Sequence, residues 1–490
     1  MAPPLKLFLK RWGLRAALAV VLALATLIVG GGCDARIRVP DLKPWHRVSL
    51  DDLKASDMGD DFTLAQYLAR EESLFAEIKQ FESTIDAAER TPVNRYSAGS
   101  RSHPSSAGRD WNRTFEVRPE VVRGGALLIH GLTDSPYSMR ATAEVLREDG
   151  VYSLALRMPG HGTVPSGLVR ATWQDWLAAV RVGVRHVKAS IPEGAPLIIV
   201  GYSNGGALAL KYTLDALEQD RSIRPAKLIL LSPMIGVTPA ARLAWWISRL
   251  GVVPYFEKAN WLDVIPEYNP FKYNSFPANA GFQTSSITRA LQADLDRAAS
   301  DGRLATVPPI LTFQSIVDAT VSTPAVVHLL YDRLPPNGSE LVLFDVNHLS
   351  GIDVFVQPGD RSLVDQLFDR QPRSYRRVLV TNGPDTRAVE ARIIEPDNAG
   401  SARRALGLVW PPQVFSLTHV AIPFPADDPL YGLEGPTTTT GLLPIGRLSP
   451  RGERAVLTVG TDTLMRLSSN PFFPFVAERI RDWTVSAASR

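Results

Sequence analysis

The chain has 490 residues, enough for one large domain with insertions or for two domains. Hydrophobic residues make up 45% and charged residues 21%, as in ordinary globular proteins. The net charge is only +3, and much of the positive excess lies near the N-terminus, so the sequence shows no basic stripe for nucleic acid. A single cysteine, Cys33, excludes internal disulfides.

Residues 1–33 are typical of a targeting segment. A basic stretch comes first and comprises Lys6, Lys10, Arg11 and Arg15. A short apolar run, Ala16–Val29, follows, and Cys33 comes directly after three glycines. This end resembles the lipobox of bacterial lipoproteins, although Gly30 stands where those proteins usually have Leu. Lipidation of Cys33 and an uncleaved anchor helix are both open, and either predicts an exported chain attached to the membrane on the periplasmic side of a bacterial envelope.

Residues 34–110 are predicted to form an N-terminal extension. Within residues 62–90, apolar side chains recur at helical spacing and build one face: Leu64, Tyr67, Leu68, Leu74, Phe75, Ile78 and Phe81. We expect this face to pack onto the main domain, with a partner or membrane role as the alternative. Residues 91–109 are rich in Ser, Gly and Arg, which predicts a mobile loop.

Residues 111–490 are predicted to form one α/β domain. Its early strands are expected at 113–117, 126–129, 152–156, 197–200, 227–231 and 310–314, with helices such as 139–149, 173–189 and 207–219 between them. This alternation predicts a mostly parallel sheet with helices on both faces. Functional groups in such sheets lie on loops at the carboxyl ends of strands.

The most informative motif is Gly201-Tyr202-Ser203-Asn204-Gly205. It follows an apolar strand and precedes a helix-forming run, which is the context of a nucleophile elbow. A Cβ at Gly201 or Gly205 would collide with the neighbouring strand or helix, so both positions require glycine. The pattern predicts that Ser203 is a catalytic nucleophile, which needs a histidine base, a carboxylate and amide donors for the oxyanion.

The amide donors are predicted at two turns. The sequence His130-Gly131-Leu132 closes the strand 126–129 and exposes the backbone amide of Leu132. Together with the amide of Asn204, it would form an oxyanion hole.

These motifs resemble the α/β-hydrolases of the esterase and lipase branch, near the serine aminopeptidase-like and monoacylglycerol-lipase-like families. The segment Pro159-Gly160-His161-Gly162 supports the resemblance, because these families carry a similar loop after the next strand. The resemblance covers about residues 114–320. It implies that His130 and His161 shape loops and do not act as bases.

An aromatic-rich stretch at about residues 237–301 interrupts the alternation of strands and helices. Its aromatic residues are Trp245, Trp246, Tyr255, Phe256, Trp261, Tyr268, Phe271, Tyr273 and Phe276. We interpret it as a cap over the site, while a satellite core without substrate contact is the alternative.

Asp318 is the predicted acid of the triad, because it follows a buried strand and matches the family's Asp-x-x-Val turn. Two histidines compete for the role of base. His348 follows the strand 340–345 at a normal family spacing, whereas His419 requires inserted strands at about 340–400. We favour His419, because the segment 470–484 looks like the helix that closes this fold and because a turn-rich segment suited to a site rim follows His419.

The remaining constellations predict no metal or cofactor. The acidic pairs at 51–52, 60–61 and 427–428 have no His or Cys beside them and are expected at solvated turns and helix caps. The sequence therefore predicts a membrane-attached serine hydrolase, a carboxylesterase or lipase acting on apolar acyl esters. The alternatives are a serine exopeptidase or amidase on small peptides, and a non-catalytic binding protein at the membrane.

Overall fold

A computed structural model of the chain describes residues 33–219, 222–236, 254–318, 320–350, 363–369, 373–398, 400–412, 414–433 and 466–488, with a few single positions besides. Most of the predicted targeting segment and residues 237–253 of the predicted cap lie outside the described residues. Among the helices that are described, none is both long and apolar enough to span a membrane.

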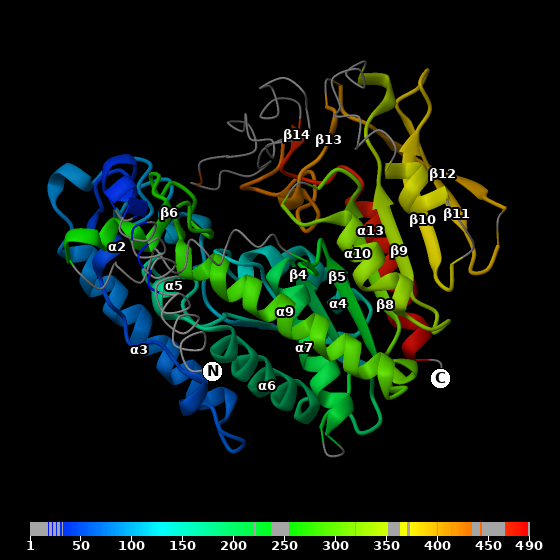
Figure 1. Cartoon of the computed structure of the whole chain (residues 1–490), viewed down its shortest axis with the longest axis horizontal. Helices are drawn as coiled ribbons and strands as arrows, with labels where there is room; N and C mark the ends of the chain where they lie inside the picture. Colours follow the sequence, from blue (N-terminus) through cyan, green and yellow to red (C-terminus); the bar gives the residue numbers. More distant parts are fainter. Residues whose placement is uncertain are drawn as a thin grey trace, which may run out of the picture.

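A 10-stranded sheet forms the centre of the molecule, in the order β1-β3-β2-β4-β5-β8-β9-β10-β11-β12 (Figure 1). The strands are β1 (Phe115–Val117), β2 (Gly124–Ile129), β3 (Val151–Leu156), β4 (Leu197–Tyr202), β5 (Lys227–Leu231), β8 (Ile310–Ser315), β9 (Glu340–Phe344), β10 (Arg376–Asn382), β11 (Ala388–Ile394) and β12 (Ala402–Val409). From β3 to β10 all neighbours are parallel, while β1, β11 and β12 pair antiparallel at the edges. The predicted α/β class and mostly parallel sheet are confirmed.

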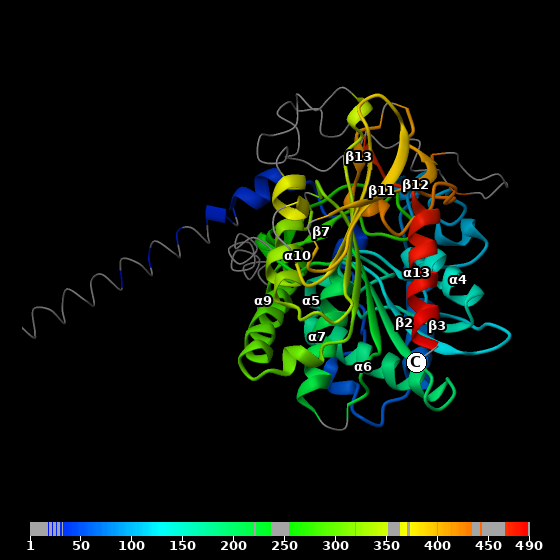
Figure 2. The same ribbon diagram turned by 90° about the vertical axis from the view of Figure 1, so that its right-hand side faces the viewer.

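Helices cover both faces of this sheet (Figure 2). The helices on one face are α6 (Trp173–Ala189), α7 (Asn204–Glu218), α9 (Ala278–Ser300) and α10 (Thr323–Leu329). The helices on the other face are α4 (Arg140–Glu148) and α13 (Phe473–Ala488). Alternate residues of β2 supply the two cores, with Leu127 and Ile129 in one and Ala126 and Leu128 in the other. This alternation follows from the two-residue period of a strand whose two faces are both buried.

The N-terminal extension packs against the side of this layered domain. Its long helix, α3 (Leu64–Ser83), buries most of the predicted apolar face, although Leu68 is exposed and Phe81 is half-buried. The helix ends before the predicted boundary and is followed by a 3₁₀ turn. The short helix α2 (Pro44–Arg47) precedes it. Residues 91–109 differ from the expectation of a mobile loop, because successive turns bury Arg95, Tyr96 and Ser102.

The C-terminal part extends the sheet and then returns to its centre. Strands β10 and β11 were predicted from the sequence, and β12 was not, because its exposed polar and basic residues lack a buried face. Asn347 and Phe415 lie side by side, because the carbonyl oxygen of Phe415 accepts a hydrogen bond of 2.7 Å from the Asn347 amide. Residues 348–414, the C-terminal insertion, therefore start and end at one place.

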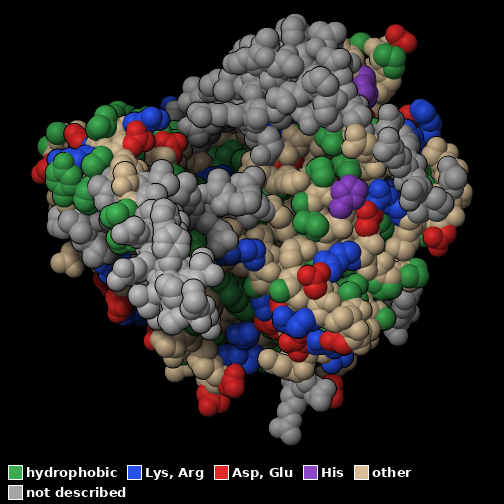
Figure 3. Space-filling model, viewed as in Figure 1, with side chains coloured by type: hydrophobic (Ala, Val, Ile, Leu, Met, Phe, Trp, Pro, Cys, Tyr) green, Lys and Arg blue, Asp and Glu red, His purple; other side chains and the backbone are tan. Residues whose placement is uncertain are grey.

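The described part of the predicted cap has two different components. Strands β6 (Trp261–Asp263) and β7 (Phe276–Pro277) form a small hairpin, whereas the long helix α9 buries Ile287, Leu291 and Leu295 in the main core beside α7. Helix α9 is thus part of the helical layer that covers one face of the sheet. On the face seen in Figure 3, acidic and basic side chains are interspersed.

Candidate active site

Ser203 lies at the sharp turn between β4 and α7. Its backbone has φ 53° and ψ −117°, a strained conformation that the turn enforces. A Cβ on Gly205 would lie 2.1 Å from the carbonyl oxygen of Ile129 on β2, and one on Gly201 would lie 2.4 Å from the carbonyl oxygen of Gly205. The two glycines thus let α7 approach the sheet closely enough to form the turn.

His419 and Asp318 lie beside this serine. His419 Nε2 is 3.0 Å from Ser203 Oγ, and His419 Nδ1 is 2.9 Å from Asp318 Oδ2. All three residues are buried. The Asp318 carboxylate also accepts hydrogen bonds from the amides of Thr320 and Val321, each at 3.0 Å. These bonds fix the carboxylate, which in turn orients the imidazole so that Nε2 can accept the serine proton.

The local fold around His419 explains its position. Strand β13 (Ser416–Leu417) pairs with β14 (Arg466–Leu467), and His419 begins the 3₁₀ turn that follows. Ser315 Oγ, at the end of β8, donates a 3.0 Å hydrogen bond to the carbonyl oxygen of Leu417. The histidine loop is thereby held against the strand whose end carries Asp318.

His348, the alternative base, lies elsewhere. Its Nε2 is 2.9 Å from Asp345 Oδ2, at the end of β9. Within the described part of the chain, Ser203 Oγ forms its side-chain hydrogen bond with His419. The structure therefore brings together Ser203, Asp318 and His419 and leaves His348 with a different carboxylate.

The His-Gly turn after β2 lies against the serine. A Cβ on Gly131 would be 3.2 Å from the Cβ of Ser203. Leu132, the next residue in the chain, therefore begins close to Ser203. Asn204 is the first residue of α7, and the first amides of a helix have no partner within it. Both predicted oxyanion donors thus lie on turns that border Ser203.

His130 holds this turn in place. Its Nε2 accepts a 3.0 Å hydrogen bond from the Met158 amide, and its Nδ1 is 2.9 Å from the Gly131 carbonyl oxygen. Burial lowers the pKa of His130 well below its usual value, and burial lowers that of His161 to about 4. Both imidazoles are neutral near pH 7, as the loop-shaping role implied by the resemblance requires.

Aromatic side chains from three segments pack together, and we call them the aromatic cluster: Tyr137, Phe271, Phe424 and Tyr431. Tyr137 stacks on Phe271 with ring centroids 4.3 Å apart, and Phe424 stacks on Tyr431 at 4.2 Å. Tyr137 follows the oxyanion turn, Phe271 belongs to the predicted cap, and the other two follow His419. The cap stretch thus joins, through Phe271, a cluster that also contains residues following His419, and its role as a cap over the site stays a prediction.

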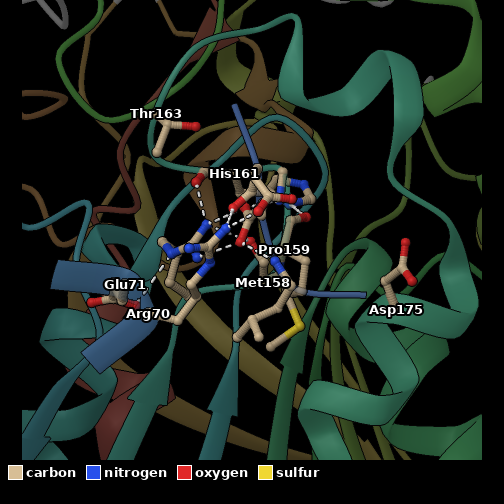
Figure 4. Close-up of polar contacts among 12 residues, drawn as sticks. Arg70, Glu71, Met158, Pro159, His161, Thr163 and Asp175 are labelled. Atoms are coloured by element: carbon tan, nitrogen blue, oxygen red, sulfur yellow. Dashed lines mark hydrogen bonds and ion pairs between the residues drawn. The ribbon is translucent and has the colours of Figure 1, made fainter. Parts of the chain in front are cut away.

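A buried arginine behind the site was missed from the sequence. Arg157, on the loop after β3, is 0% exposed at its side chain and binds Asp52 through Nη1 at 2.8 Å and Nη2 at 2.9 Å. Its Nε lies 3.2 Å from Glu71 Oε2 of α3. Figure 4 labels Glu71 and His161 among the residues around this contact. Arg157 Nη1 also donates to the His161 carbonyl oxygen at 3.0 Å, so the N-terminal extension supplies the counter-charges for the loop that His130 contacts.

The electrostatics of this network depend on burial and pairing. Burial raises the pKa of Asp52, but the charge and hydrogen bonds of Arg157 outweigh it, and the net pKa is lowered. Burial raises the pKa of Glu71 against the opposing charge of Arg157. A signal did exist in the sequence, because Glu71 falls on the apolar face of α3.

The expectation that the acidic pairs lie in solvated turns is wrong for two of their members. Asp52 is buried on Arg157, as described above, with a side chain 10% exposed. Asp428 is buried and accepts hydrogen bonds of 2.9 Å from Tyr137 Oη and Arg140 Nη2. In both cases a basic partner distant in sequence compensates the carboxylate, which no local pattern reveals.

Comparisons with known proteins match the middle part of the chain. Residues 121–346 match the family model described as serine aminopeptidase, S33. A thermostable monoacylglycerol lipase of Bacillus sp. (strain H-257) is 27% identical over 232 residues, which are 47% of this chain and 84% of that protein.

Among solved structures, the monoacylglycerol lipase of Paleococcus ferrophilus is 14% identical with a TM-score of 0.36, covering 48% of this chain and 89% of its own. A soluble variant of the monoglyceride lipase of Saccharomyces cerevisiae is 18% identical with a TM-score of 0.35, covering 47% and 82%. The family match and the sheet with its nucleophile turn identify the chain as an α/β-hydrolase of the esterase and lipase branch.

Proposed function

We propose that the chain is a serine hydrolase that cleaves acyl esters through Ser203, His419 and Asp318. The observation that supports this role is the continuous hydrogen-bonded series from Asp318 Oδ2 to His419 and on to Ser203 Oγ. Asp318 keeps the imidazole proton on Nδ1, so that Nε2 is free to accept the proton of Ser203. No cofactor takes part in the proposed reaction.

The reaction then proceeds in two halves. Ser203 Oγ attacks the ester carbonyl, its proton passes to His419, and the amides of Leu132 and Asn204 donate to the oxyanion. His419 returns the proton to the leaving alcohol, and the acyl group stays on Ser203. A water molecule, deprotonated by His419, attacks the acyl-enzyme and releases the carboxylic acid.

An apolar acyl ester is the proposed substrate class. The similar Bacillus protein bears the name monoacylglycerol lipase, which fits an ester with an apolar chain.

Labelling with a fluorophosphonate tests the proposal. We expect stoichiometric labelling of the folded chain, located at Ser203 by mass spectrometry and absent from Ser203→Ala. A folded wild-type chain that resists the reagent and hydrolyses no p-nitrophenyl ester would instead support the non-catalytic binding protein.

The family description itself favours a second candidate, an exopeptidase or amidase, because it names a serine aminopeptidase. Both reactions use the same acyl-enzyme chemistry and differ in the leaving group. Parallel kcat/KM measurements on p-nitrophenyl esters and aminoacyl p-nitroanilides distinguish them. We expect the esters to be preferred, and a preference for the anilides would overturn the ester assignment.

We further propose that the enzyme is exported and attached to the membrane through its N-terminal segment. The basic residues before Ala16–Val29 and the glycine-preceded Cys33 support this address. Membrane fractionation of the wild-type chain and Cys33→Ala tests it. Release of the variant would indicate a lipid on Cys33, retention would indicate an anchor helix, and soluble wild-type protein would contradict both.

A further inference from the structure

A cavity of about 590 Å³ lies between the N-terminal extension and the hydrolase domain. Helix α3 forms one wall with Phe75 and Ile78, the turns around Arg95 and His103 form another, and Gly162 and Thr163 close it from the domain side. Ser203, Asp318 and His419 are not among the described residues that line it. Its volume lies within the range of sites for small molecules.

Arg95 is part of the floor of this cavity and is incompletely paired. The residue is 1% exposed, and its Nη2 donates a long, 3.4 Å hydrogen bond to Asn112 Oδ1. Its Nε and Nη1 atoms have no hydrogen-bond partner among the described residues. A buried guanidinium with two unpaired nitrogens is costly to fold unless an acceptor reaches it.

The guanidinium carbon of Arg95 lies 5.5 Å from the centre of the Tyr96 ring and 5.4 Å from that of Tyr273, and Glu267 acts on its charge electrostatically. Burial raises the pKa of Glu267, and the positive charge of Arg95 opposes that shift, so the two groups interact. The Glu267 carboxylate, however, accepts the amides of Asn274 and Ser275, at 2.9 and 2.8 Å. The hydrogen-bonding capacity of Arg95 is therefore still available.

The other residues that line the cavity define what could pair with Arg95. Lys79, Arg90 and Arg113 add positive charge, and Glu82 and Asp110 offset part of it. The cations outnumber the carboxylates in this lining, which favours an anionic ligand. The apolar walls, with Phe75, Ile78, Tyr96 and Pro104, suit a short hydrocarbon.

We propose that this cavity, here called the Arg95 cavity, binds a carboxylate that carries a short apolar chain. The carboxylate end lies at the floor and accepts hydrogen bonds from the Arg95 guanidinium, and the chain contacts Phe75 and Ile78 of α3. The site is separate from Ser203, so its occupant is bound and not turned over. It exists only because the N-terminal extension closes over the domain.

Hydrogen–deuterium exchange on the full chain locates the binding. With octanoate as the probe, we expect protection of peptides covering residues 75–83 and 90–113. Protection confined to peptides around Ser203 and His419 would assign octanoate to the active site and overturn the proposal. Equal protection by 1-octanol would contradict recognition of the anion, and equal protection by inorganic phosphate would contradict the need for an apolar chain. No protection by octanoate at millimolar concentration would also overturn it.

Two variants measure the contribution of Arg95. We expect Arg95→Gln to weaken octanoate binding about tenfold or more in calorimetry, because a charge-assisted hydrogen bond is lost. Arg113→Gln is the matched control: Arg113 lines the same cavity but already pairs with Glu72, so we expect a change within about threefold. Unchanged binding by a folded Arg95→Gln would overturn the proposal, and if that variant does not fold, the exchange pattern of the wild-type chain decides alone.

Discussion

The N-terminal extension and the C-terminal insertion are both additions to one catalytic sheet, and they join it in different ways. The extension, residues 34–110, docks from outside and places Asp52 and Glu71 against the buried Arg157. The insertion, residues 348–414, continues the sheet itself, as β10 pairs with β9 in parallel register. The extension is coupled to the domain by a buried ion-pair network. The insertion is coupled to it by backbone hydrogen bonds and apolar packing.

This difference matters for the site. The extension contacts the turn His130-Gly131-Leu132 only indirectly. Its carboxylates bind Arg157, Arg157 holds the following loop, and the Met158 amide of that loop donates a hydrogen bond to His130. The insertion changes only the sequence distance of the base, since His419 follows Asp318 by 101 positions and still reaches it. An insertion whose ends meet, at Asn347 and Phe415, leaves the geometry of the site unaltered.

The largest expected effect distinguishes the two histidines on either side of the insertion. His419→Gln should lower kcat/KM for p-nitrophenyl esters about a thousandfold or more, because Ser203 loses its base. His348→Gln should stay within about threefold of wild type, since His348 pairs with Asp345 away from Ser203. A large loss in His348→Gln with little loss in His419→Gln would reverse the assignment.

The next effect tests the charged contact of the extension. Asp52→Asn leaves Arg157 buried with a weakened partner, so we expect a loss of about 3–5 kcal/mol in the free energy of unfolding by urea. Its neighbour is a matched control, because Asp51 is 90% exposed at its side chain and pairs with Arg70 at the surface. Asp51→Asn should cost about 0–1 kcal/mol. Equal costs for the two variants would show that the extension is held mainly by apolar packing.

What the sequence could predict follows the same division between local and distant contacts. The turn at Ser203 and the acid turn at Asp318 are local patterns, in which strand, turn and neighbouring residues stand together in the chain. Asp52 and Arg157 are 105 positions apart, and no local sequence pattern at either residue predicts the ion pair. The edge strand β12 was not predicted from the sequence, because an exposed strand has no alternating apolar face.

The base required an argument about topology, because local pattern alone favoured neither His348 nor His419. Both follow a strand, and the spacing from Asp318 favoured His348. The closing helix, found as α13 at Phe473–Ala488, indicated that the sheet was not yet complete at β9. The order of the elements in the fold, and not the number of residues between motifs, favours His419.

Acid should destabilise the chain through buried histidines, of which His46 lies in the extension and His161 in the hydrolase domain. Burial lowers the pKa of His46 to about 3 and that of His161 to about 4, against 6.5 in the unfolded chain. The unfolded state therefore binds more protons below pH 6.5, and the free energy of unfolding falls as the pH is lowered. Asp134, whose pKa burial raises to about 6, opposes this with one proton.

Urea unfolding at pH 7.5 and pH 5 measures this slope. Each uncompensated proton corresponds to about 1.4 kcal/mol per pH unit. His46→Gln should reduce the slope by up to about one proton, because the imidazole of the extension no longer titrates in the unfolded state. His328→Gln, at an exposed position on α10, is the control. A variant with the wild-type slope would show that His46 does not contribute.

The smallest effect concerns one of the charges that the insertion contributes to the sheet. Arg376 of β10 lies 3.3 Å from the buried carboxylate of Glu340, which also binds Arg479 of α13 at 2.7 Å. When Arg376 is replaced by Gln, Glu340 keeps its better partner, and we expect a loss of about 0–1 kcal/mol in the free energy of unfolding. Arg479→Gln, which removes the two shorter hydrogen bonds, should cost more. If Arg376→Gln proved as costly as Asp52→Asn, the insertion would also depend on a charge that cannot be left unpaired, and the contrast between the two additions would fail.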